Sequence, residues 1–217
     1  MANKVEICNL ALGNIRAGSI NALTENSLEA QVCNQRFDLA VEFLLREYPW
    51  RFATTSTALS LLTDSPLEWA YAYDYPTDCL RALYVMPQLS VGTDRTIAYH
   101  FEDWETDHRQ AHRAPWQLGQ GDDGGRVILT NQAEAYLVYI ATQTDASRFD
   151  PHFVEALSWY LASLIAVPII GAETGRKLRA ESLEIYKEIL PAATARDANE
   201  SYGVARVPES PTILERR

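Results

Sequence analysis

The sequence has few of the residues that build metal clusters, disulfide frameworks or nucleic-acid surfaces. Three cysteines occur in 217 residues, at wide spacing and without a CxxC pair, which argues against a zinc cluster or a disulfide framework. Cys8 and Cys33 fall on apolar faces of expected helices, so we interpret them as small buried hydrophobic residues. Only three lysines occur and the net charge is −10, whereas binding to nucleic acid depends on clustered Lys and Arg.

Long apolar runs are also missing. No uninterrupted run reaches the roughly 18 residues that suggest a membrane helix, and the best candidate, residues 159–170, is shorter and contains Pro168. The first residues carry Glu6 and lack the pattern of a signal peptide. We therefore expect a protein that is made in a cytoplasm and has no membrane partner.

Catalytic motifs are absent as well. There is no GxSxG elbow, and none of the four histidines has a recognisable triad context. His108 and His112 would face together on a helix and have acidic neighbours, but no HExxH pattern and no third ligand at a fixed spacing accompany them, so we interpret this segment as a solvated loop. The glycine-rich segment 119–125 carries two central aspartates that would repel a phosphate, so it predicts a hairpin tip. The sequence predicts neither an enzyme nor a cofactor.

Helical periodicity is present at both ends of the chain. Apolar spacing predicts helices over 3–16 and 27–48, the second of which ends at Pro49. Asp150 and Pro151 are a typical helix start and predict a helix that Pro168 and Gly171 close, followed by another over about 173–189. We expect the two helical hairpins, residues 1–50 and 150–191, to bury their apolar stripes in a four-helix bundle.

Between the hairpins the hydrophobic period changes towards two, which predicts an inserted antiparallel β-module over 51–149. Its expected strands are 54–62, 69–75, 80–86, 96–101, 127–130 and 135–142. From residue 192 the chain is polar and without periodicity, so residues 192–217 are predicted to form an extended C-terminal tail. The predicted fold class is α+β, mainly α.

Four aromatic residues occupy alternate positions in one expected strand: Trp69, Tyr71, Tyr73 and Tyr75. On a strand, alternate side chains lie on the same side. Asp74 and Asp78 lie beside them, and paired carboxylates next to rings are compatible with a carbohydrate-binding or glycan-hydrolysing protein. The interpretation that we prefer makes the rings the inner layer of the β-module, with tyrosine hydroxyls at its rim.

Several local strings stand in a characteristic order along the chain. They are Ile7 to Gly13, Ala30 to Asp38, Tyr48 to Ala53 (YPWRFA) and Tyr71 to Arg81. Together with the order of elements, they resemble the tail tubular protein A, or head-to-tail adaptor, family of short-tailed bacteriophages. The resemblance covers most of the chain.

The resemblance implies a structural protein of the virion tail or neck, made in the host cytoplasm. Such a protein forms a ring of about twelve copies between the portal protein and the tail nozzle protein, and duplex DNA passes through the ring during packaging and ejection. The helical bundle would pack beside its neighbours and meet the portal, while the β-module would point towards the nozzle. Acidic residues along the lumen would repel DNA and keep it mobile.

The resemblance also implies that the C-terminal tail docks on a neighbouring copy or on a portal subunit. Docking segments are held by a few apolar or aromatic side chains. The candidates in the tail are Tyr202, Val204, Val207, Ile213 and Leu214.

Overall fold

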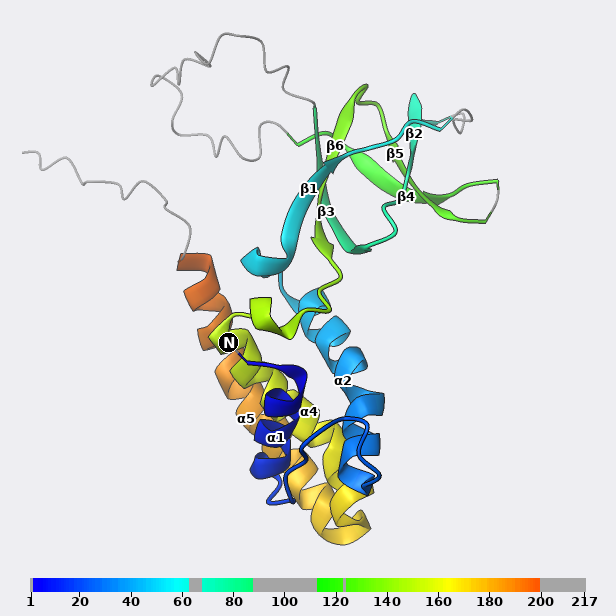
Figure 1. The fold of residues 1–217 in the computed structure, drawn as a ribbon. Helices are drawn as coiled ribbons and strands as arrows, with labels where there is room; N and C mark the ends of the chain where they lie inside the picture. Colours follow the sequence, from blue (N-terminus) through cyan, green and yellow to red (C-terminus); the bar gives the residue numbers. More distant parts are fainter. Residues whose placement is uncertain (1, 63–67, 88–112, 123, 200–217) are drawn as a thin grey trace, which may run out of the picture.

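The computed structural model describes residues 2–62, 68–87, 113–122 and 124–199. Within these ranges the chain forms four α-helices, two short 3-10 helices and two small antiparallel β-sheets (Figure 1). The α-helices lie at one end of the molecule and the sheets at the other. The predicted α+β class is confirmed.

The first two helices begin at capping residues that the sequence supplies locally. Helix α1 (Lys4–Asn14) has a capping box, in which the Asn3 side chain accepts from the Glu6 N–H and the Glu6 carboxylate accepts from the Asn3 N–H, both at 2.9 Å. Helix α2 (Leu28–Glu47) begins at Ser27, whose hydroxyl accepts from the Ala30 N–H. These bounds agree with the predicted helices to within one or two residues.

Helix α4 (Pro151–Ile170) begins at Pro151 and ends before Gly171 as predicted, but Pro168 lies within it and does not help to end it. The Asp150 carboxylate accepts from the backbone N–H groups of His152 and Phe153 at 2.7 and 3.3 Å. The helix continues through Pro168 and ends at Gly171, whose φ of 98° favours glycine. Gly171 alone therefore ends this helix.

Helix α5 (Ala172–Asn199) is longer than predicted and includes Pro191. The prediction of an extended tail is therefore wrong for residues 192–199. The physical reason is tertiary packing, because Ala193 and Asp197 are buried in the last turns of the helix. Residues 200–217 lie outside the described part of the chain.

Helix α4 is the common partner of the other three helices, since it packs against α1, α2 and α5. Its inward side chains and the apolar stripes of the other helices form one continuous core, which includes the fully buried Cys8 and Cys33. Gly175 permits the close approach of α5 to α4, because a Cβ at this position would lie 2.7 Å from the carbonyl oxygen of Ala166.

The β-module lies between α2 and α4 in the sequence, and its described residues form two three-stranded antiparallel sheets. The strand order is β1-β6-β3 in one sheet and β2-β5-β4 in the other. The strands are β1 (Thr54–Ala58), β2 (Tyr71–Asp74), β3 (Cys79–Pro87), β4 (Trp116–Gln120), β5 (Arg126–Thr130) and β6 (Ala135–Ala141). Strand β4 was not predicted, and the expected strand 96–101 lies outside the described residues.

The two sheets share a core, and a hairpin connects β4 with β5. Tyr73 and Ile128 of one sheet pack with Val85 and Leu137 of the other. The hairpin tip contains Gly124 at a φ of 80°, within the predicted turn over 119–125. The prediction is wrong for Gly119 and Gln120, which belong to β4 because they pair with β5.

The aromatic strand is arranged differently from the prediction. Tyr73 is buried in the shared core, and Tyr71 and Tyr75 pack against it. Trp69 instead packs with Ala72 and its neighbours on the other face of the sheet. The expectation that all four rings face one side is therefore wrong for Trp69, which precedes the first residue of β2.

Candidate interaction surfaces

Aromatic rings fill the junction between the helices and the β-module. Trp50 is fully buried, donates its indole N–H to the Leu44 carbonyl at 2.9 Å and packs edge-on against Phe153 at 5.1 Å. Phe52 lies 5.8 Å from Phe149 and 5.0 Å from Phe153. Since these rings come from both segments that connect the helices with the strands, their packing fixes the two parts of the molecule relative to each other.

Arg51 connects this junction to the last turns of α5. Its backbone N–H donates to both carboxylate oxygens of Asp197, at 3.1 and 3.3 Å, and its Nε donates to the Asp197 carbonyl oxygen at 2.8 Å. A cation at the C-terminal end of a helix interacts favourably with the helix dipole. The contact therefore stabilises the end of α5, from which residues 200–217 continue.

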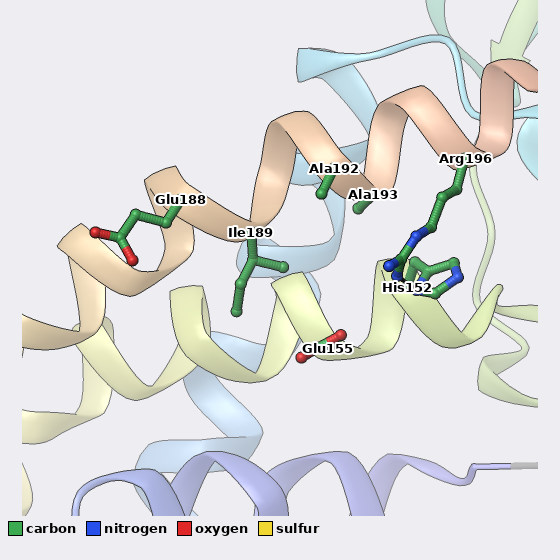
Figure 2. Close-up of a pocket in the computed structure, with 7 residues that line it drawn as sticks. All are labelled: His152, Glu155, Glu188, Ile189, Ala192, Ala193 and Arg196. Atoms are coloured by element: carbon green, nitrogen blue, oxygen red, sulfur yellow. Dashed lines mark hydrogen bonds between the residues drawn. The ribbon is translucent and has the colours of Figure 1, made fainter.

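A groove of about 250 Å³ lies between the first turns of α4 and the last turns of α5; we name it the α4/α5 groove (Figure 2). His152 and Arg196 lie at one end, Glu188 at the other, and Ile189 between them. Glu155, Ala192 and Ala193 complete the lining.

Two side chains meet at the basic end of the α4/α5 groove. Nη1 of Arg196 lies 3.1 Å from Nδ1 of His152. A guanidinium can only donate, so Arg196 is the donor in any hydrogen bond between them. An apolar floor with the Glu155 carboxylate beside it, between a basic and an acidic end, suits a short peptide of mixed character.

The outer face of α2 is a second candidate surface. Leu28, Leu39 and Phe43 are 51%, 57% and 40% exposed. At 3.6 residues per turn they fall within about 60° of one another around the helix axis. The Phe43 ring also stacks on Tyr160 of α4 at 4.6 Å. We name these three residues the α2 outer stripe.

The β-module places the two candidate carboxylates in different environments. Asp78 accepts a hydrogen bond from the Tyr139 hydroxyl at 3.0 Å, whereas Asp74 is exposed at the end of β2. Tyr73 is 2% exposed and donates its hydroxyl to the Gln132 carbonyl at 2.9 Å. Its ring is thus an inner-layer residue and is not available to stack on a sugar.

The pKa of the Tyr139 hydroxyl is strongly raised. Burial, followed by the hydrogen bond and the negative charge of Asp78, raises the pKa of Tyr139 to about 12. All three causes favour the neutral phenol, because the ionised form would be desolvated, would lose its hydrogen bond to Asp78 and would repel the carboxylate.

The buried thiols of Cys8 and Cys33 contact each other. Their hydrogen bond, together with burial, raises the pKa of Cys8 above its usual range, so this thiol is neutral. In the part of the chain that the structure describes, no three His, Cys, Asp or Glu residues are grouped to hold a metal ion. His108 and His112 lie outside that part.

The predicted docking residues also lie outside the described part of the chain: Tyr202, Val204, Val207, Ile213 and Leu214. The α4/α5 groove and the Arg51–Asp197 contact were not predicted. Both depend on the last turns of α5, which the polar composition after residue 191 did not indicate.

Among the described residues, one helix, Pro151–Ile170, is long and apolar enough to cross a membrane. The run 159–170 is too short by itself to cross a membrane, whereas an 18-residue window of this helix has a mean hydropathy of 1.8. Packing explains this apolar character, because α4 is the helix that the other three cover.

Comparison of the chain with protein-family models and with curated protein sequences finds no match.

Proposed function

We propose that this chain is a structural virion protein that forms an adaptor ring between the portal and the tail nozzle of a short-tailed bacteriophage. The α2 outer stripe is the observation that supports the proposal most. Single exposed apolar residues are ordinary, but three on one side of a helix indicate a protein contact. A contact between two different surfaces of identical copies repeats around a ring until the ring closes.

The proposed arrangement uses the two ends of the molecule differently. The four helices form a bundle of two hairpins, α1 with α2 and α4 with α5, which packs beside neighbouring copies and meets the portal. The β-module points towards the nozzle, and the tail docks on a neighbour or a portal subunit. The net charge of −10 supports a lumen that repels passing DNA without binding it.

Native mass spectrometry of the full chain tests this function. The chain is measured alone and after mixing with the portal protein encoded in the same genome. We expect a monomer alone and a multi-copy ring on the portal, because the portal would template assembly. A chain that stays monomeric in the presence of the portal would contradict the proposal.

A further inference from the structure

We propose that the α4/α5 groove binds the C-terminal segment 213–217 of the same chain while the chain is monomeric. This proposal goes beyond the adaptor function and does not depend on it. The lining of the groove, its charges and its distance from the tail support the proposal.

The chemistry of the segment matches the lining of the groove. The segment reads Ile213-Leu214-Glu215-Arg216-Arg217, two apolar residues followed by an acid and two arginines. Ile189, Ala192 and Ala193 provide an apolar floor, Glu155 places a second carboxylate beside it, and Glu188 provides an acidic end. Apolar contacts over the floor and charge pairs at the acidic end would thus act together.

The direction of the chain agrees with this match. Residues 200–217 leave α5 after Asn199, one turn beyond the basic end of the groove at Arg196. A segment that turns back along α5 therefore passes Arg196 first and Glu188 last. Its apolar residues then lie over the floor, and its two arginines reach the acidic end.

The distance from the end of α5 to the groove is also compatible with docking of the segment. Ile189 lies about 15 Å from Asn199 along the helix, at 1.5 Å per residue. Residues 200–212 connect Asn199 with the segment, and a chain of this length can span up to about 40 Å when extended. Such a tether gives an effective concentration of about 1 mM, so even a weak contact would be populated.

Docking in this way would cover Ile213 and Leu214 in the free chain. These two residues are among the candidates for docking on a partner, so a partner would compete with the groove for them. With the segment docked, the free chain would expose less apolar surface than it would with the segment undocked.

Paramagnetic NMR on the full-length chain tests the proposal. A nitroxide is attached at Thr212→Cys, beside the segment and not within it, and the unsubstituted chain receives the same treatment as a control for labelling of the buried native cysteines. We expect the amide signals of Ile189, Ala192 and Ala193 to lose intensity by at least about twofold, because any contact with a Kd below the effective concentration of about 1 mM is mostly populated. Unchanged signals would overturn the proposal.

Charge reversal tests the specificity of the contact. Glu188→Lys should reduce the broadening, and adding Arg216→Glu and Arg217→Glu to Glu188→Lys should restore it. Glu42→Lys, the same charge change on the exposed side of α2, should leave the broadening unchanged. Equal effects of Glu188→Lys and Glu42→Lys would overturn the assigned contact.

A mixing experiment separates docking within one chain from docking between copies. Isotope-labelled chain without nitroxide is mixed with nitroxide-labelled chain without isotope. We expect no loss of signal at Ile189, Ala192 or Ala193 in this mixture. Broadening in the mixture equal to that within the single chain would overturn the proposal in favour of docking between copies.

Discussion

At the scale of single residues, Trp50 is a fully buried ring at the junction. It follows Pro49, which ends α2, and its ring is buried between α2 and α4. The chain thus changes from helix to strand around a fixed side chain.

Trp50→Phe should lower the free energy of unfolding by about 2–3 kcal/mol, because the buried Leu44 carbonyl loses its donor and the smaller ring leaves a cavity. Urea unfolding followed by circular dichroism measures this change. Trp116→Phe, at a partly exposed position on β4, is the matched control and should cost less than about 1 kcal/mol. Equal losses in the two variants would contradict the role assigned to Trp50.

The raised pKa of Tyr139 predicts that the free energy of unfolding depends on pH in the alkaline range. Burial and Asp78 raise its pKa in the folded chain from 10.0 to about 12. A raised folded-state pKa contributes stability that is fully present below pH 10 and is lost as the pH rises through about 12. The free energy of unfolding should therefore fall over this interval, and Tyr139→Phe should make the fall smaller.

The comparison with Tyr139→Phe is necessary because the pKa of Tyr75 is also raised to about 12, chiefly by burial. Denaturant unfolding of both proteins below pH 10 and near pH 12 isolates the contribution of Tyr139. Identical slopes for the two proteins would show that Tyr139 does not titrate as described.

At the scale of elements, the sequence predicted helix starts better than helix ends. Asn3, Ser27 and Asp150 act on backbone groups two or three residues away, so their effect is visible in a local pattern. The end of α5 depends on contacts between Arg51 and Asp197, which are 146 positions apart. These contacts and the burial of Ala193 maintain the helix beyond Pro191, and no local pattern reports them.

The missed strand and the candidate groove have the same cause. Strand β4 contains glycine and two glutamines, and it is a strand because β5 pairs with it. The α4/α5 groove requires the last turns of α5, whose helical state the sequence did not indicate. Local chemistry thus predicted most elements, whereas the surfaces between elements required the tertiary structure.

Asp197→Ala should loosen the last turns of α5. The Arg51 backbone N–H loses a charged acceptor, and a hydrogen bond to a charged group contributes about 1.5–3 kcal/mol. Protection of the amides of residues 194–199 against hydrogen exchange should fall by about tenfold or more. Lys187→Ala, at an exposed position on the same helix, is the control and should leave this protection unchanged. Unchanged protection in Asp197→Ala would contradict the assigned contact.

At the scale of the whole molecule, two different surfaces are placed at a fixed separation. The α2 outer stripe lies on the helical end, the sheets form the other end, and the aromatic junction holds the two together (Figure 1). A ring that joins two different partners requires this property, because each copy must present both surfaces in the same relative orientation.

Leu39→Glu should therefore block ring assembly and leave the monomer intact. Leu39 is 57% exposed, so the change should alter the stability of the monomer by no more than about 0.5 kcal/mol. A buried charge at a central contact costs about 2 kcal/mol or more. Since every copy in a closed ring makes this contact, the loss is repeated around the ring.

Leu61→Glu is the matched control, because Leu61 is 62% exposed and belongs to the β-module. In native mass spectrometry with the portal alone, this control should form rings as the unsubstituted chain does, since its substitution lies on the end assigned to the nozzle. Leu39→Glu should remain monomeric. If both variants formed rings equally well, the α2 outer stripe would not be the contact between copies. If both failed, the two ends of the molecule would not have the separate roles that the proposal requires.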